Sequence, residues 1–202
     1  MEGKVFVIEG IDGAGKATQT KILKKKLEDN GKNVSVYSYP DYSSVYGERI
    51  KSFLYKKIDI KVDELFMLYL ADMVKDKTRI IDDVKKGYYI LIDRFFFSTI
   101  AYQSAGGFPY DTGKEFVKLL GMPPIDTVFY INVPVDISMQ RKEKQKGKMD
   151  VDKFESNKLF LSRVSTFYDK LKSENFYAKK WVEIDGSKPI EEISYLINQN
   201  IN

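Results

Sequence analysis

The stretch GIDGAGKAT, residues 10–18, decides the fold of this chain. It follows the phosphate-binding loop pattern G-x-x-x-x-G-K-[ST], with Gly10, Gly15 and Lys16 at the expected places. The last position departs from the pattern, because Ala17 stands where a serine or threonine hydroxyl normally contacts Mg²⁺. The glycine–lysine part of the pattern occurs by chance in about one chain of this length in twenty. The surrounding sequence is therefore needed to decide whether this stretch is a phosphate-binding loop.

The flanking sequence supports a phosphate-binding loop. Residues 4–9, KVFVIE, form a short apolar run of the kind that lies buried in a parallel sheet. After the loop, Leu23 and Leu27 lie on one helical face, and Asn30 ends that helix. A helix N-terminus after a glycine-rich loop directs backbone N–H groups at an anion, and Lys16 would reach the β- and γ-phosphates of a nucleotide. The alternative is a plain strand-to-helix turn.

The composition restricts the available chemistry. The 202 residues include no cysteine and no histidine. Disulfides, thiolate nucleophiles and zinc–thiolate sites are therefore excluded, and so is imidazole acid–base catalysis. Phosphoryl transfer suits the remaining side chains, because it depends mainly on positioning and on the stabilisation of charge. The net charge of +4 is typical of a lysine-rich solvated surface, and we expect no nucleic-acid partner.

The chain shows no targeting signal. No apolar run approaches the roughly 18 residues that a membrane span requires, and the chain begins without the pattern of a signal peptide. We therefore expect no membrane association and a cytoplasmic location.

Four further apolar runs predict strands, and the intervals predict helices. Strands are expected at residues 33–39, 88–92, 127–133 and 181–184, and helices at 44–55, at 62–84 and from Pro189 onward. Alternation of strands and helices indicates an α/β fold of the P-loop NTPase type. Its three layers would be a five-stranded parallel sheet and helices on both of its faces.

Two segments stand out from this pattern. Residues 142–153, KEKQKGKMDVDK, are charged and poor in apolar side chains, and they predict an exposed loop inserted between two helices. Residues 65–71, LFMLYLA, are apolar on every side of the predicted helix. They require cover by the core and, in addition, by a ligand or another subunit.

Charged residues end two of the predicted strands, at the sheet edge where open α/β folds bind ligands. Arg94 follows Asp93 and would grip a phosphate bidentately, although a salt-bridged strand end explains it as well. Ala17 cannot ligate Mg²⁺, an ion that keeps several waters and is held largely by substrate phosphates. We therefore expect Glu9 and Asp93 to hold Mg²⁺ through water.

Several linked motifs resemble those of the thymidylate kinase family. GIDGAGKATQ is similar to the family's phosphate loop with its internal aspartate, and DRFFFSTIAYQ, residues 93–103, to its D-R-[YFH]-x-x-S-x-x-A-Y-Q motif. MPPIDTVFYINVP, residues 122–134, resembles its P-x-P-D-x-x-x-x-L-x-V-P strand. DKFE, residues 152–155, resembles the D-R-x-E that ends the family's lid, and VEIDGS, residues 182–187, resembles its last strand and adenine loop. The motifs follow one another in order, and the resemblance runs from about residue 4 to residue 197.

The resemblance implies one P-loop kinase domain over residues 1–202, with a lid at about 142–153. The implied activity is transfer of the ATP γ-phosphoryl group to dTMP, giving dTDP and ADP, with Mg²⁺ as cofactor. A homodimer packed through the helix near Leu65 to Leu70 is implied as well.

The resemblance also implies the site residues. The catalytic set is Lys16, Arg94, Arg141 and Asp12. The ATP-binding set is Gly10, Ile11, Asp12, Gly13, Ala14, Gly15, Lys16, Ala17, Thr18, Arg141, Asp185 and Gly186. The dTMP-binding set is Asp12, Tyr39, Pro40, Tyr69, Met73, Arg94, Ser98, Tyr102 and Gln103.

Within these sets the implied roles differ. Asp12 would hold the 3′-hydroxyl of the acceptor, and Arg94 its phosphate. Tyr69 would stack on thymine, and Tyr102 would leave no room for a ribose 2′-hydroxyl. Because Gly13 replaces an arginine that some members carry, the lid around Arg141 would supply the charge that stabilises the transferring group.

Other departures keep alternatives open. Met73 and Tyr42 stand where family members carry arginines near the acceptor, so a kinase of the same fold for another deoxynucleoside monophosphate, such as dUMP, is an alternative. Ala17 keeps a second alternative open, in which the chain is a catalytically weak nucleotide-binding homologue.

Overall fold

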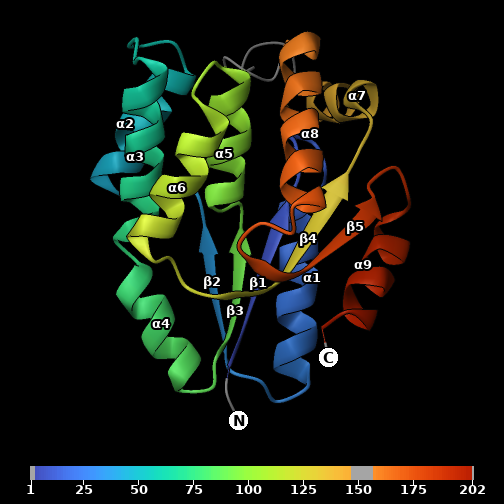
Figure 1. The fold of residues 1–202 in the computed structure, drawn as a ribbon. Coiled ribbons are helices and arrows are strands. Elements are labelled where there is room, and N and C mark those ends of the chain that lie inside the picture. Colours follow the sequence, from blue (N-terminus) through green and yellow to red (C-terminus); the bar gives the residue numbers. More distant parts are fainter. Residues whose placement is uncertain (1–2, 147–156, 202) are drawn as a thin grey trace.

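Five parallel strands form the central sheet, in the order β2-β3-β1-β4-β5. The computed structural model describes residues 3–146 and 157–201. The strands are β1 (Lys4–Glu9), β2 (Val34–Ser38), β3 (Tyr89–Asp93), β4 (Ile125–Asn132) and β5 (Ala178–Asp185). All of them point in one direction, and their carboxyl ends meet at one edge (Figure 1). The predicted five-stranded parallel sheet is confirmed.

The register of the central strands brings the two motifs of the site together. β1 is buried along most of its length and lies between β3 and β4. Ile8 pairs with Asp93, so the phosphate loop (residues 10–18) and Arg94 leave neighbouring strand ends at the same level. The functional residues are therefore positioned by the central strands of the sheet.

Helices cover both faces of the sheet, as predicted (Figure 1). The described helices are α1 (Lys16–Asp29), α2 (Val45–Leu54), α3 (Val62–Val74), α4 (Lys77–Lys85), α5 (Phe96–Ala105), α6 (Tyr110–Leu120), α7 (Val135–Lys146), α8 (Lys158–Ser173) and α9 (Ile190–Gln199). α1 and α9 pack against each other on one face, whereas α5 contacts α3, α6 and α8 on the other.

The prediction of a single helix over residues 62–84 is wrong. A turn at Lys75 and Asp76 divides it into α3 and α4. The apolar periodicity crosses this break, because Met73 before it and Ile80 after it are both buried in the same core. Periodicity therefore could not reveal the boundary.

The predicted loop at residues 142–153 begins too early. α7 continues to Lys146, because lysine, glutamate and glutamine favour helix and the first glycine comes only at position 147. Residues 147–153 of the expected lid lie outside the described residues, and so does the DKFE motif.

The apolar segment 65–71 is covered largely by its own chain. Leu65, Phe66 and Leu70 are buried, and α3 packs against both α2 and α5. Phe66 stacks on Phe108 with ring centroids 4.1 Å apart. Met67 stays 43% exposed, so the surplus apolar surface is smaller than the sequence predicts.

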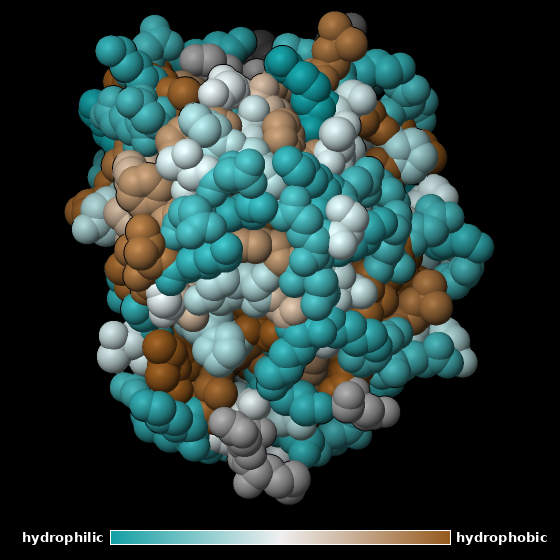
Figure 2. All heavy atoms as spheres, viewed as in Figure 1, coloured by the Kyte–Doolittle hydropathy of each residue, from teal (hydrophilic) through white to brown (hydrophobic). Residues whose placement is uncertain are grey.

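The visible surface is mixed in character. Figure 2 shows hydrophilic residues over most of one face, with hydrophobic residues in small separate areas. Within residues 3–146 and 157–201, we find no helix with both the length and the apolar character that a membrane crossing needs.

Candidate active site

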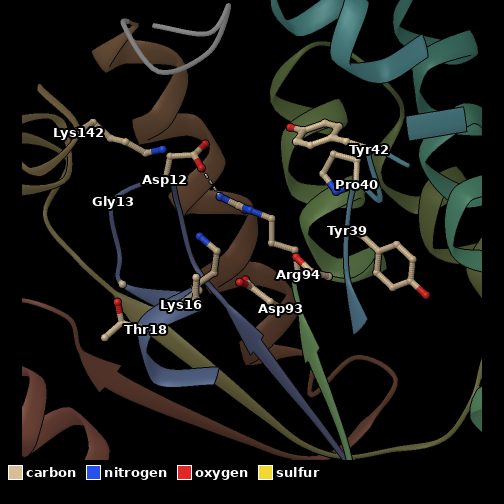
Figure 3. A pocket seen from close by; sticks show the side chains of 13 residues that line it. Asp12, Gly13, Lys16, Thr18, Tyr39, Pro40, Tyr42, Asp93, Arg94 and Lys142 are labelled. Atoms are coloured by element: carbon tan, nitrogen blue, oxygen red, sulfur yellow. Dashed lines mark hydrogen bonds and ion pairs between the residues drawn. The ribbon is translucent and has the colours of Figure 1, made fainter. Parts of the chain in front are cut away.

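A cavity of about 270 Å³ opens where β1 and β3 end. We call it the phosphate cavity; it is lined by Asp12, Gly13, Gly15, Lys16, Ala17, Thr18, Ser38, Tyr39, Pro40, Tyr42, Asp93, Arg94 and Lys142. Figure 3 shows Lys16, Asp93 and Arg94 gathered at the strand ends, with Lys142 reaching toward Asp12 from another segment. Segments that are far apart in the sequence thus share one cavity.

The phosphate loop is tightly curled and packed against α7. Gly13 and Gly15 have φ angles of 77° and 91°, a left-handed region that disfavours other residues. A Cβ atom at Gly13 would lie 2.5 Å from the backbone oxygen of Ser138, so the first turn of α7 leaves no room for a side chain there. Lys16 Nζ donates to the Ile11 carbonyl oxygen at 2.9 Å, which holds the lysine over the loop.

Arg94 is the most constrained side chain in the cavity. Its backbone is left-handed, with φ 63°, a strained conformation that clusters at functional sites. Nη1 donates to the Gly10 carbonyl oxygen at 3.0 Å and to Ser98 Oγ at 3.1 Å. Nη2 forms an ion pair with Asp12 Oδ1 at 2.6 Å. The other oxygen of Asp12 accepts from the Tyr102 hydroxyl at 3.1 Å.

Burial and charge shift the pKa values of this group. Burial lowers the pKa of Lys16 to about 8, helped by the positive charge of Arg94 and opposed by Asp12. Burial alone would raise the pKa of Asp12, but Arg94 and then Lys16 hold it well below its usual range. Asp12 is therefore a carboxylate, and Lys16 gives up its proton far more easily than a solvated lysine.

A second hollow, which we call the aromatic cleft, continues from the phosphate cavity. Both include Asp12, Tyr39, Pro40, Tyr42 and Arg94. The cleft is further lined by Leu54, Tyr69, Met73, Ser98, Thr99, Tyr102 and Gln103. All nine residues of the predicted dTMP-binding set thus line this one cleft.

Thr99 is a cleft residue that sequence reasoning missed. It is buried, and its hydroxyl has no hydrogen-bond partner within the described part of the chain. A buried unpaired hydroxyl is costly, so the Thr99 side chain is unusual among the residues of this cleft. Its position directly after Ser98 in the same motif was the available signal. Tyr39, in contrast, directs its hydroxyl to Asp76 at 3.0 Å and contributes only its ring.

A third cavity, which we call the outer cavity, lies on the far side of the phosphate loop. It is lined by Gly13, Ala14, Gly15, Thr18, Gln19, Arg141, Ser187, Lys188, Pro189, Ile190 and Ile193. Arg141 Nη1 donates to the Gly186 carbonyl oxygen at 2.8 Å, which ties α7 to the turn after β5. Asp185 closes that turn by accepting from Ser187 N and Oγ.

Two expected site residues lie outside the phosphate cavity. Arg141 lines the outer cavity and is absent from the phosphate cavity, where Lys142 lies instead. Glu9 is fully buried and lines none of the three cavities described above. Its carboxylate accepts hydrogen bonds from Phe95, Ser98 and Tyr168, and burial raises its pKa.

Comparison with known proteins decides the family. A family model described as thymidylate kinase matches residues 8–197. The chain belongs to the thymidylate kinase family.

Known thymidylate kinases resemble this kinase along nearly its whole length. The thymidylate kinase of Thermosipho melanesiensis is 34% identical, over 98% of this chain and 96% of its own. That of Fervidobacterium nodosum is 35% identical, over 92% and 91%. A solved thymidylate kinase from Candida albicans has the same fold, with a TM-score of 0.79, 22% identity, and 99% and 91% coverage. The resemblance seen in the sequence is confirmed, and the comparisons give no support to another acceptor or to a silent homologue.

The donor set of this kinase fits a Mg²⁺ ion bound together with nucleotide phosphates. Asp93 lines the phosphate cavity beside Lys16, and Mg²⁺ needs only one or two carboxylates when phosphates and water complete its shell. Among the residues that the structure describes, no cluster of three or more acidic side chains could hold the ion without phosphates. Glu9, the other expected carboxylate, lies outside the cavity, and its oxygens already accept hydrogen bonds from Phe95 and Tyr168.

Proposed function

We propose that this kinase transfers the γ-phosphoryl group of ATP to dTMP, giving ADP and dTDP. One observation carries the proposal: the phosphate cavity and the aromatic cleft meet at Asp12 and Arg94. A nucleotide phosphate on the phosphate loop would therefore lie next to the phosphate of a nucleotide whose base fills the cleft. This is the arrangement that in-line phosphoryl transfer requires.

The chain supplies binding and charge to both substrates. Lys16 and the N–H groups of the phosphate loop hold the β- and γ-phosphates of ATP, and the outer cavity around Arg141 takes its adenine. Arg94 grips the acceptor phosphate, and Asp12 accepts from the sugar 3′-hydroxyl. The acceptor oxygen is already anionic, so the step needs no general base.

The aromatic cleft accounts for the acceptor base and sugar. Tyr69 stacks on thymine, and the Gln103 amide offers hydrogen bonds to its edge. Tyr102 is held by Asp12 and fills the space next to the sugar.

An acceptor panel tests the proposal. ADP release is measured with ATP, Mg²⁺ and, in turn, dTMP, dUMP, dCMP, dGMP and dAMP. We expect the highest kcat/KM for dTMP, because a mostly apolar cleft favours the base that carries a methyl group. A rate no higher than that of a Lys16→Ala variant would contradict the kinase assignment, and a preference for dUMP would contradict the acceptor.

Mg²⁺ would bind through Asp93, by way of water, and through the phosphates of ATP. When bound, it neutralises charge on the β- and γ-phosphates. We expect Ala17→Thr to lower the Mg²⁺ concentration for half-maximal rate by about 5-fold, because it restores one hydroxyl interaction. Ala17→Val has the same shape without the hydroxyl and should leave the Mg²⁺ requirement unchanged. An equal effect of both substitutions would show that the hydroxyl is irrelevant.

Lys142 is proposed as the cation that α7 brings to the transferring group. It lines the phosphate cavity, and its charge helps to lower the pKa of Asp12. We expect Lys142→Ala to lower kcat by about 30-fold, since it removes a charge that acts on the transition state. Lys144→Ala is the matched control, because Lys144 is exposed and lines none of the three cavities. Equal kcat values for the two variants would exclude this role.

We also propose that residues 1–202 act as one domain in the cytoplasm, and that the kinase is a homodimer. One core extends from β1 to α9, and the substrates are intracellular nucleotides. Met67 on α3 is the exposed apolar residue that a second copy would cover. Sedimentation should give a dimer for the unaltered protein and a monomer for Met67→Glu; an unaltered protein that sediments as a monomer would refute the dimer.

A further inference from the structure

A buried cluster lies beneath Arg94 and is assembled from four parts of the chain. Glu9 ends β1, Arg94 follows β3, Ser98 lies on α5 and Tyr168 lies on α8. Glu9 and Tyr168 are both completely inaccessible to solvent. Such a polar cluster in a core demands that every hydrogen bond be satisfied.

The two carboxylate oxygens of Glu9 accept hydrogen bonds from four donors. Oε1 accepts from the backbone N–H groups of Phe95 at 2.8 Å and Ser98 at 3.3 Å. Oε2 accepts from Ser98 Oγ at 2.6 Å and from the Tyr168 hydroxyl at 2.8 Å. The carboxylate thus holds the start of α5 in place through both the backbone and the side chain of Ser98.

The Ser98 hydroxyl has a single proton, and the place where that proton is donated fixes the direction of the hydrogen bond between Ser98 and Arg94. A hydroxyl donates once, and Ser98 donates to Glu9. Its oxygen is therefore left as an acceptor, and Arg94 Nη1 donates to it at 3.1 Å. The Tyr168 hydroxyl lies 2.7 Å from the same oxygen, but its own single proton is donated to Glu9 Oε2, so the oxygen of Ser98 is left to Arg94.

The orientation of the Ser98 hydroxyl determines whether its oxygen can accept a hydrogen bond from the Arg94 guanidinium. Nη1 of Arg94 is shared between Ser98 and the Gly10 carbonyl oxygen, and Nη2 is bound to Asp12. These three acceptors define the plane of the fork that lines both cavities. A Ser98 hydroxyl turned the other way would point its proton at a cation.

We propose that Glu9 and Tyr168 are positioning residues for the acceptor phosphate, which act by holding Ser98 as a hydrogen-bond acceptor for Arg94. The inference rests on the proposed function, in which Arg94 binds that phosphate. It assigns a role to Tyr168, which stands 70 residues from Ser98 in the sequence, and a role other than metal binding to Glu9.

Tyr168→Phe isolates the hydroxyl from the packing. The Tyr168 ring stacks on Tyr130 with centroids 5.1 Å apart, and phenylalanine preserves that contact. Tyr130→Phe is the matched control, because Tyr130 is the other buried ring of the pair and its hydroxyl lies beside Ser165. Melting temperatures of both variants check that the fold is intact.

The test compares equilibrium binding of dTMP with that of thymidine, which lacks the phosphate. In Tyr168→Phe we expect the affinity ratio of dTMP to thymidine to fall by about 5-fold, the loss of one typical hydrogen bond. KM for dTMP should rise by the same factor, with kcat and KM for ATP unchanged. Tyr130→Phe should alter none of these values.

A double variant tests the route through Ser98. Ser98→Ala should lower the same ratio, and adding Tyr168→Phe to it should cause no further loss. Additive losses, an unchanged ratio in Tyr168→Phe, or equal losses for dTMP and thymidine would overturn the inference. If the unaltered protein bound dTMP no more tightly than thymidine, the proposed function itself would fail, which is a distinct outcome.

Discussion

Replacing Lys16 with alanine is expected to lower kcat/KM for the kinase reaction by about 1,000-fold, the scale of losing a buried charge that acts on the transition state. Lys16 lies in the phosphate cavity at the N-terminus of α1, and Asp12 and Asp93 balance its charge. Alanine removes the cation from the β- and γ-phosphates and leaves those carboxylates to repel the nucleotide. Coupled measurement of ADP release gives the rate.

Lys21→Ala is the control for this variant. Lys21 lies on the same helix and is exposed, so its loss should change kcat/KM by less than 2-fold, as is usual for surface substitutions. A reduction of less than about 10-fold in Lys16→Ala would mean that the phosphate loop contributes to binding through its backbone alone.

The pKa of Lys16 adds a pH dependence with a defined sign. Because the pKa in the free enzyme is about 8, the lysine loses its charge above this pH, and KM for ATP should rise. Between pH 8 and 10.5 the unfolded chain binds more protons at Lys16 than the folded chain does. The contribution of this group to the free energy of unfolding therefore increases with pH in that window, which urea titrations would detect.

Arg94→Lys should raise KM for dTMP by about 100-fold, although it conserves the charge. The guanidinium donates hydrogen bonds to Gly10, Ser98 and Asp12 at the same time. A lysine ammonium cannot make these bonds and also bind a phosphate through two donors. KM for ATP should change far less, because in the proposed function Lys16 and the N–H groups of the phosphate loop hold the phosphates of ATP. Steady-state kinetics with each substrate varied in turn separate the two constants.

Arg79→Lys provides the comparison. Arg79 lies on α4, is exposed, and stacks over the Tyr37 ring at 5.9 Å, away from both cavities. It should leave both KM values unchanged. An equal rise in both constants for Arg94→Lys would indicate general damage to the sheet edge and would argue against a specific acceptor role.

The fold was largely predictable because its signals are local. The apolar runs of β1 and β3 and the glycine-rich loop between β1 and α1 each follow from neighbouring residues. The order of the motifs then indicated the family, which the comparisons confirm. The boundary between α3 and α4 was missed, because the helices bury apolar residues in one core and share one periodicity.

The candidate site was predictable only where a residue lies within a motif. Asp12, Lys16, Arg94 and Tyr102 follow from their positions in the sequence, and their roles stay predictions for the experiments above. Lys142, next to the expected arginine, could not be distinguished from other lysines of its run. Which cation enters the cavity depends on the direction in which α7 leaves the sheet.

The sequence by itself therefore determined the class of fold, the phosphate loop and the family, since these depend on short-range pattern. The tertiary structure alone decided the partners of the buried polar groups. Glu9 and Tyr168 are 159 residues apart, and no local pattern records that they meet. Their contact results from the packing of α8 against α5, and packing sets the hydrogen-bond directions that hold Arg94 in place.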